Sequence, residues 1–207
     1  MDYRTTYEPV AVTEAPAPPA ADPAPGGLTG RGRRREVLET ALLTVVIFFV
    51  VNYTTGRYRI DGDSMEPTMH NREYVIINKV SYKIGQPQRG DIIVFEYPRS
   101  PDRDFIKRII GLPGDTVDIR NGAVFVNGAK LTEVYIADAP LYSSTWTVEP
   151  AQYFVLGDNR NNSSDSHSWG LLPAENIIGK AWVTYWPITD WGIVPHVAYD
   201  NVPDPSP

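Results

Sequence analysis

An apolar stretch near the N-terminus places the strongest constraint on how this chain of 207 residues can fold. Residues 41–51 read ALLTVVIFFVV, and the wider stretch 37–53 carries a single charged residue, Glu39. As a helix, these 17 residues would be about 25 Å long, slightly short of the ~30 Å hydrocarbon layer of a bilayer. Tyr53 and the flanking arginines can make up the difference at the two interfaces. We therefore predict that residues 31–53 form a basic flank followed by one transmembrane helix.

Two other interpretations of this stretch stay open. A cleaved secretory signal would be followed by a small-x-small site, whereas the residues that follow read NYTTGRYR. A buried core helix can also contain a short apolar run. As an anchor, the stretch is preceded by four arginines and followed closely by only two, so the positive-inside rule places the N-terminus in the cytoplasm and residues after 54 outside. The preceding four are Arg31, Arg33, Arg34 and Arg35.

Composition limits the partners and sites that the chain can have. A net charge of -6 and an isoelectric point near 5.1 argue against a nucleic-acid partner, because phosphate binding needs a basic surface. The sequence has no cysteine, which excludes disulfides, thiolate nucleophiles and cysteine-bound zinc. Its three histidines are scattered, so we do not expect a histidine-based metal site.

The rest of the chain predicts one β-rich domain between two tails. Residues 1–30 include the tract TEAPAPPAADPAPGGLTG, which has too few bulky apolar residues for a core, so we expect a disordered arm. Residues 54–190 contain Val/Ile/Tyr/Phe runs such as YVIINKVSY, DIIVFEYP, QYFVLGD and IIGKAWVTYWP. Asn-Gly between TVDIR and AVFVN predicts a tight hairpin. A less regular part, about 128–150, suggests a small insertion. Residues 191–207 are expected to be a C-terminal tail, whose closing stretch DNVPDPSP is frayed.

The segment DGDSMEPTM, residues 61–69, contains a candidate nucleophile, Ser64. Taken alone, a serine in a turn of Gly and Asp is more often structural. A nucleophilic serine also needs a base. A Ser-His-Asp triad could use His70, His167 or His196, but nothing in the spacing favours any of them.

A second segment, FIKRIIGLPGD, offers a lysine as the base. Lys107 follows Phe105 and Ile106 and is followed, after Arg108, by two isoleucines. Burial among apolar side chains disfavours the charged ammonium and lowers its pKa. A drop of roughly two to three units from ~10.4 would make the amine a usable base near neutral pH. The alternative is that Lys107 and Arg108 lie on a strand, where one side chain reaches solvent and the other pairs with a carboxylate.

These two segments and a third, GDNRNNSSDSHSWG, together resemble bacterial type I signal peptidases, the membrane-bound Ser/Lys leader peptidases, in a form familiar from cyanobacteria and plastids. By itself the third segment is a polar loop rich in turn-forming residues. The resemblance covers about residues 36–187 and rests on the order of GDSMEPTM, RGDIIVFEYP with FIKRIIGLPGD, and the third segment, behind an N-terminal anchor. It implies a mainly β fold: an antiparallel β catalytic domain with a small inserted β region, plus one N-terminal transmembrane helix.

The resemblance also implies a role for each matching residue. Ser64 corresponds to the nucleophile and Lys107 to the general base that accepts its proton. Ser163 corresponds to a serine that hydrogen-bonds and orients the lysine. Asp165 corresponds to an aspartate in a salt-bridge network, with Arg108 as the expected partner. The Ser64 backbone N–H would be one oxyanion donor.

Two positions depart from the pattern of many family members. Some members have an oxyanion-binding serine two residues before the nucleophile, where this chain has Gly62, so a second donor would come from backbone or water. Many have arginine where this chain has His167, which we interpret as a support residue. Met65, Phe105 and Ile106 are candidates to line shallow apolar pockets for small substrate side chains at positions -1 and -3.

The expected function is removal of signal peptides from translocated preproteins through an acyl-enzyme, without a metal or organic cofactor. The expected partners are secretory preproteins and the lipid bilayer, close to the translocation machinery. The expected location is the bacterial plasma membrane, with the thylakoid membrane as an alternative. Two other functions stay open: a self-cleaving SOS-repressor-type protease, which would need a DNA-binding domain in place of the anchor, and a tethered β domain that binds preproteins without cutting.

Overall fold

The computed structural model describes residues 30–199 and 201–202. The predicted arm of residues 1–30 therefore lies outside the described residues, apart from its last residue. The described part begins with a helix of 25 residues, α1 (Gly30–Thr54). Among the described residues, it is the one helix that is long and apolar enough to cross a bilayer. Its apolar side chains are exposed, Phe48 by 61%, which argues against a buried core helix.

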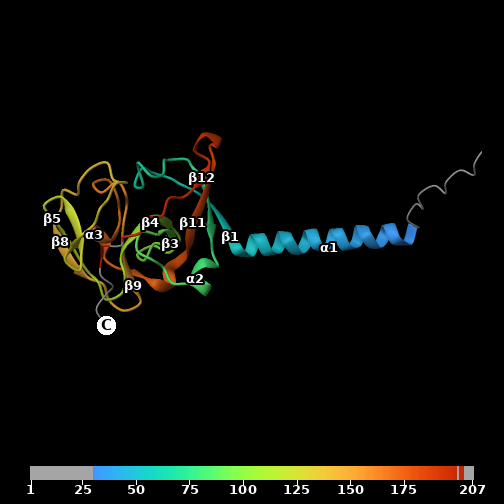
Figure 1. The fold of residues 1–207 in the computed structure, drawn as a ribbon, viewed down its shortest axis with the longest axis horizontal. Helices are drawn as coiled ribbons and strands as arrows, with labels where there is room; N and C mark the ends of the chain where they lie inside the picture. Colours follow the sequence, from blue (N-terminus) through green and yellow to red (C-terminus); the bar gives the residue numbers. More distant parts are fainter. Residues whose placement is uncertain (1–29, 200, 203–207) are drawn as a thin grey trace, which may run out of the picture. The chain divides into compact units, whose positions relative to one another are not determined.

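After α1, the chain forms a mainly antiparallel β domain around one large sheet (Figure 1). Eight strands form this sheet in the order β1-β2-β11-β3-β4-β9-β10, with β12 paired to β11. β11 comes late in the sequence but lies between β2 and β3, so the sheet joins distant parts of the chain. The strands are β1 (Thr55–Arg59), β2 (Tyr74–Asn78), β3 (Ile92–Glu96), β4 (Asp104–Gly111), β9 (Gln152–Leu156), β10 (Leu172–Pro173), β11 (Ile177–Trp186) and β12 (Gly192–Ile193).

A smaller sheet of four strands is inserted between β4 and β9, in the order β7-β6-β5-β8. Asn121 and Gly122 have φ angles of 50° and 69° and join β5 to β6, which confirms the predicted hairpin. The sheet begins at Thr116, whereas the sequence suggested an insertion from about 128. In β5 and β6, buried residues alternate with more exposed ones, so these two strands look like strands of the main domain in the sequence. Its strands are β5 (Thr116–Arg120), β6 (Ala123–Val126), β7 (Ala129–Lys130) and β8 (Ser144–Thr147).

Short helical turns complete the described domain. They are α2 (Ser81–Ile84), α3 (Ser166–Trp169), and the 3-10 turns η1 (Ala174–Asn176) and η2 (Ile188–Asp190).

Strands in the middle of the large sheet are buried on both faces. On β3, Ile92 and Val94 belong to one hydrophobic cluster, whereas Ile93 and Phe95 belong to another. This explains why β3 reads as a continuous apolar run instead of an alternating one. A third cluster lies under the small sheet and includes Phe154 of β9. Two packed faces therefore hold β3 and its neighbour β4 in place.

Residues 191–199, the first part of the predicted C-terminal tail, pack onto the domain. The closing stretch DNVPDPSP, predicted to be frayed, lies outside the described residues except for residues 201–202. β12 pairs with β11, and Val194 is only 2% exposed. A Cβ added to Gly90, which has a φ of 91°, would lie 1.8 Å from the Val197 carbonyl oxygen, so only glycine fits there. The sequence predicts a tail here because the segment contains no apolar run. Its packing depends instead on one glycine and a few contacts.

Candidate active site

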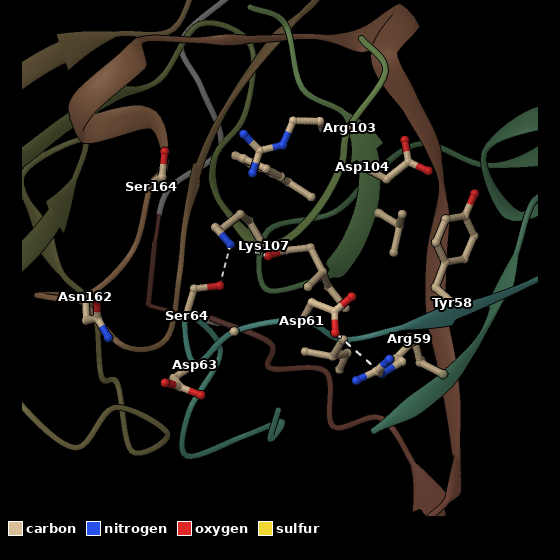
Figure 2. A pocket seen from close by; sticks show the side chains of 16 residues that line it. Tyr58, Arg59, Asp61, Asp63, Ser64, Arg103, Asp104, Lys107, Asn162 and Ser164 are labelled. Carbon is tan, nitrogen blue, oxygen red and sulfur yellow. Dashed lines mark hydrogen bonds and ion pairs between the residues drawn. The ribbon is translucent and has the colours of Figure 1, made fainter. Parts of the chain in front are cut away.

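A cavity of about 460 Å³ is lined by two segments of the chain, residues 58–64 and residues 103–107 (Figure 2). The first segment comprises the end of β1 and the loop that follows it, and the second includes the first half of β4. Val75 and Val94, from neighbouring strands, also line the cavity. Ser64 and Lys107 lie together on its wall.

Ser64 and Lys107 are in direct contact. Lys107 Nζ lies 2.6 Å from Ser64 Oγ and 2.6 Å from the carbonyl oxygen of Ile106. The Lys107 side chain is buried, with 4% of the residue exposed, whereas Ser64 is half-buried at the cavity wall. A hydroxyl and a buried amine in hydrogen-bond contact are the geometry that a serine nucleophile and its base require.

Burial changes the chemistry of this lysine. It lowers the pKa of Lys107 from 10.5 to about 8, while the negative charges of Asp165 and Asp158 act in the opposite direction. With a pKa of about 8, about one amine in ten is neutral at pH 7. The apolar neighbours in the sequence predicted a shift of this direction and size.

The loop that carries Ser64 is fixed by backbone contacts. Gly62 has a φ of 104°, which favours glycine, and its N–H donates to Asn71 Oδ1 at 3.2 Å. Asn159 donates from its backbone N–H to the Ser64 carbonyl oxygen and from Nδ2 to the Asp63 carbonyl oxygen, both at 3.1 Å. Two loops far apart in the sequence therefore position the Ser64 hydroxyl.

Arg108 pairs with Asp158, which corrects the expected pairing with Asp165. Its Nε donates to Asp158 Oδ1 at 2.8 Å and its Nη2 to Oδ2 at 2.7 Å, and both side chains are fully buried. The register explains the choice, because Arg108 lies opposite Leu156 and Asp158 follows two residues later. Thr68 Oγ1 also donates to Asp158, at 2.5 Å. This carboxylate thus connects the strand of the lysine to the loop of the serine.

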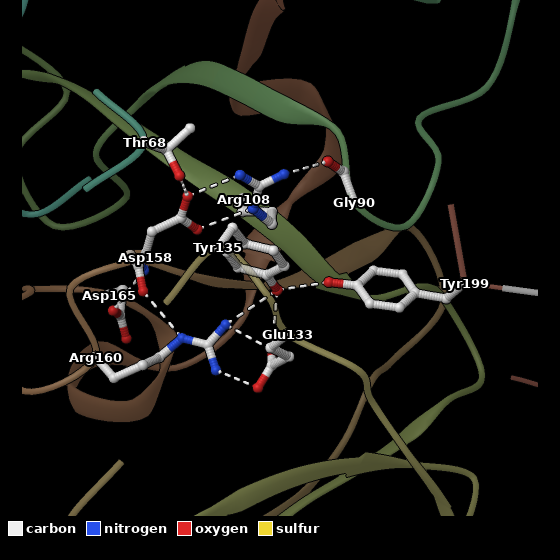
Figure 3. A network of polar contacts seen from close by, with 10 residues as sticks. Thr68, Gly90, Arg108, Glu133, Tyr135, Asp158, Arg160, Asp165 and Tyr199 are labelled. Atoms are coloured by element: carbon white, nitrogen blue, oxygen red, sulfur yellow. Dashed lines mark hydrogen bonds and ion pairs between the residues drawn. The ribbon is translucent and has the colours of Figure 1, made fainter. Parts of the chain in front are cut away.

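A second buried ion pair lies next to the first (Figure 3). Arg160 donates to both carboxylate oxygens of Glu133, at 2.9 and 2.6 Å. The Tyr135 ring lies near both guanidinium groups. Its centroid is 4.0 Å from Arg108 Cζ and 5.8 Å from Arg160 Cζ. The Tyr135 hydroxyl shares a 2.5 Å hydrogen bond with that of Tyr199. The C-terminal segment therefore completes a charged network behind the Ser64–Lys107 pair.

Asp165 supports the third segment instead of pairing with an arginine. Its Oδ2 accepts from the Gly157 N–H at 2.9 Å, and its Oδ1 lies 2.6 Å from His167 Nδ1. The His167 ring stacks on Tyr142, with centroids 4.1 Å apart. No hydrogen bond or ion pair found among the described residues joins His167 to Ser64 or Lys107.

Ser163 does not make the hydrogen bond that the resemblance implied. Its Oγ is buried and has no hydrogen-bond partner among the described residues. Lys107 instead contacts the Ile106 carbonyl oxygen. Ser163 Oγ packs against Gly157, where an added Cβ would lie 2.2 Å from this hydroxyl and 2.4 Å from the Ser64 carbonyl oxygen. The close packing around Gly157 holds Ser163 near the site without a bond.

The three expected substrate-contact residues occupy different positions. Phe105 and Ile106 line the cavity. Met65 is completely buried in the hydrophobic cluster with Ile77 and is not among the residues that line the cavity. The backbone forms a turn directly after Ser64, in which the Met65 carbonyl oxygen accepts from the Met69 N–H at 3.0 Å.

Sequence reasoning missed Asp158, Asn159 and Gly157 as members of the site. All three lie in the GDN part of the third segment, which in the sequence alone has the composition of one polar loop. A usable signal was present, because a buried arginine next to the candidate base requires a carboxylate partner. Tyr58, on β1, also lines the cavity, which the sequence alone does not predict.

Comparisons with known proteins agree on one family. The family described as signal peptidase, peptidase S26, matches residues 33–186. The chain is 41% identical over 179 residues to probable signal peptidase I-2 of Synechocystis sp., covering 83% of this chain and 82% of that protein. It is 42% identical over 193 residues to signal peptidase I of Leptolyngbya laminosa, covering 87% and 94%. A crystal structure of a signal peptidase I from Enterococcus faecalis matches with 36% identity and a TM-score of 0.44, covering 47% of this chain and 97% of that chain.

Proposed function

Because the chain belongs to the signal peptidase family, peptidase S26, we propose that it is a membrane-anchored serine endopeptidase that uses Ser64 and Lys107 to remove signal peptides from translocated preproteins. One observation carries the assignment of these two residues. Lys107 Nζ, buried and with its pKa lowered to about 8, lies 2.6 Å from Ser64 Oγ. No other group among the described residues forms a hydrogen bond with Ser64 Oγ.

The proposed reaction proceeds through an acyl-enzyme. Neutral Lys107 takes the proton of Ser64 Oγ as this oxygen attacks the carbonyl carbon of the scissile bond. The Ser64 N–H, which donates to no described residue, donates to the resulting oxyanion. The Lys107 ammonium then gives its proton to the leaving amine, and the peptide C–N bond breaks. Lys107 next activates a water molecule, which hydrolyses the ester and frees the signal peptide from Ser64.

The substrate is proposed to bind as an added strand. β9 pairs with β4 only from Arg108 onward, so residues 104–107 have no strand partner on that side among the described residues. An extended cleavage segment can use these backbone groups, and its alternate side chains would enter the cavity. Phe105 and Ile106 are proposed to limit the side chains at -1 and -3 to small ones.

The remaining site residues are proposed to position the dyad. Arg108, through Asp158, connects the strand of Lys107 to the Ser64 loop. Asp165 and His167 hold the loop that follows β9. The negative charge of Asp165 also raises the pKa of Lys107, against the larger effect of burial. Gly62 allows the turn before Ser64, and Ser163 fills the space beside Gly157.

The anchor is proposed to determine where the reaction occurs. Residues 31–53 would span the bilayer once, with residues 1–30 in the cytoplasm and the catalytic domain, about residues 54–190, on the outer face. Preproteins emerging from the translocation machinery would meet the site there. We propose the bacterial plasma membrane, with the thylakoid membrane as the alternative; finding the chain with its domain on the cytoplasmic side would contradict both.

The test is cleavage of a purified preprotein with an Ala-x-Ala site by the full chain in detergent, compared with Ser64→Ala and Lys107→Met. Cutting at that site by the parent alone supports the proposed dyad. Cutting that persists in Ser64→Ala would overturn the assignment of the nucleophile. A folded parent that binds the preprotein without cutting would instead support a tethered binding domain.

A further inference from the structure

A second cavity, of about 270 Å³, lies beside the C-terminal end of α1 and shares no lining residue with the cavity at Ser64. It is lined by Lys79, Lys83, Gln86, Ala174, Ile177 and Ile178, among others.

The turn that bears the two lysines is attached directly to the end of the candidate span. The Lys79 N–H donates to the carbonyl oxygen of Thr54, the last residue of α1, at 2.9 Å. Asn78 Oδ1 accepts from the backbone N–H groups of Val80 and Ser81, at 2.9 and 3.1 Å, which fixes the turn. If α1 spans the bilayer, this turn lies where hydrocarbon gives way to lipid headgroups.

Both lysines are held near this boundary by the end of the helix and by β1. Lys83 Nζ donates to the Tyr53 hydroxyl at 3.0 Å and lies 4.7 Å from the centroid of its ring. The Lys79 stem crosses β1 at Gly56, because a Cβ added there would lie 2.9 Å from Lys79 Cε. The Lys83 ammonium therefore lies at the end of α1, and the Lys79 stem lies over β1 two residues beyond it.

The cavity has positive charge without a compensating carboxylate. Neither Lys79 nor Lys83 forms an ion pair with a described residue, and no Asp or Glu lines the cavity. Asp91, which accepts from the Tyr82 hydroxyl, already pairs with Lys180 at 2.7 Å. In a chain with a net charge of -6, two unpaired lysines in one cavity favour an anion from outside the protein.

The chemistry of the lining favours an amphiphilic anion. Lys79, Lys83 and the Gln86 amide can donate to phosphate oxygens, while Ile177 and Ile178 offer an apolar wall to a glycerol ester or the start of an acyl chain. We propose that this cavity binds the phosphodiester headgroup of an anionic phospholipid. The proposal rests on the membrane anchor of the proposed function, but not on its catalytic residues.

The experiment is native mass spectrometry of the full chain released from detergent micelles that contain equal amounts of phosphatidylglycerol and phosphatidylcholine. The variants are Lys79→Gln, Lys83→Gln and the double substitution. Lys130→Gln, at an exposed lysine of the small sheet, is the matched control. We expect retention of phosphatidylglycerol to fall about fivefold for each single variant and about 25-fold for the double variant, but not for the control. Equal retention by the parent and the double variant, or no preference of the parent for phosphatidylglycerol, would overturn the proposal.

Two further arms separate the possible sources of the signal. Displacement of phosphatidylglycerol by excess inorganic phosphate would indicate a site for a free anion and would contradict a lipid site. Preprotein cleavage is measured in the same samples and is expected to be unchanged in the double variant. A parent that retains the lipid but cuts no preprotein would refute the proposed function and leave the lipid site standing.

Discussion

Lys107 is a buried residue with an ionisable amine. Its burial favours activity but lowers the stability of the folded protein. Burial keeps part of the amine neutral and therefore able to accept a proton from Ser64. The same burial makes the charged form expensive in the folded protein. A functional group of this kind is held in place by the stability of its surroundings, here the packed faces around β3 and β4.

The catalytic rate should rise with pH around a midpoint near 8. Burial lowers the pKa of Lys107 to about 8, and the proposed mechanism uses only the neutral amine. Below this value, kcat/KM should fall about tenfold for each pH unit. The measurement is preprotein cleavage from pH 6 to 10, with Ser64→Ala as the blank. A midpoint near pH 10, as for a solvated lysine, would contradict the proposed role.

Lys107→Met should stabilise the folded protein at pH 7 although it abolishes activity. Between pH 8 and 10.5 the unfolded chain binds more protons at Lys107 than the folded protein, so the stability of the parent rises with pH across this window. The shift from 10.5 to about 8 corresponds to about 3 kcal/mol. The advantage of Lys107→Met should therefore be full below pH 8 and vanish above pH 10.5.

Denaturant unfolding of both proteins at pH 7 and pH 10.5 checks this. Lys130→Met, at an exposed lysine, is the control and should show no such dependence. An equal difference between Lys107→Met and the parent at both pH values would rule out a charge penalty at Lys107.

His167→Ala should retain substantial activity. The ring contacts Asp165 and Tyr142, and in the described structure it makes no hydrogen bond to Ser64 or Lys107. We expect kcat to fall by much less than the roughly 10²-fold or greater loss that follows removal of a general acid or base. Preprotein cleavage measures this directly, and a loss as deep as that of Ser64→Ala would overturn the support role.

At the scale of elements, much of the domain could be predicted from the sequence. The runs YVIIN, IIVFE and QYFVL became β2, β3 and β9, and the Asn-Gly dipeptide at 121–122 became the predicted hairpin. The ion pair of Arg108 could not be predicted, because the choice between Asp158 and Asp165 depends on how β4 aligns with β9. Local sequence specifies strands well, whereas partners across a sheet follow from register.

The C-terminal segment also required the structure, and its contribution can be measured. Tyr199→Phe removes the hydrogen bond to the Tyr135 hydroxyl, and we expect the free energy of unfolding to fall by about 1 kcal/mol. Burial raises the pKa of Tyr199 to about 12, so the hydroxyl stays protonated in the assay. Tyr142→Phe is the control, because the Tyr142 hydroxyl is buried without a partner among the described residues, and its removal should not destabilise. Equal effects of the two substitutions would show that Tyr199 contributes only its ring.

At the scale of the whole molecule, charge around the anchor should determine orientation. Substituting the four arginines before the span with glutamate should leave a fraction of chains with the catalytic domain in the cytoplasm, because positively charged residues next to a span are retained there. Protease added to intact cells should digest the domain of the parent and spare that of the inverted chains. A parent whose domain is protected in intact cells would refute the proposed orientation. The residues to change are Arg31, Arg33, Arg34 and Arg35.

The position of β11 in the large sheet has a consequence for the order of events during synthesis. β11 spans Ile177–Trp186 and separates β2 from β3, so the sheet stays open until the ribosome has made nearly the whole chain. Ser64 and Lys107 are both made by the time about half of the 207 residues have been joined, but the loop that fixes Ser64 contains Asn159. A partly translocated chain therefore carries both reactive groups without the frame that brings them together. We therefore expect proteolytic activity to arise only once the C-terminal third of the chain has been made, after the catalytic residues themselves.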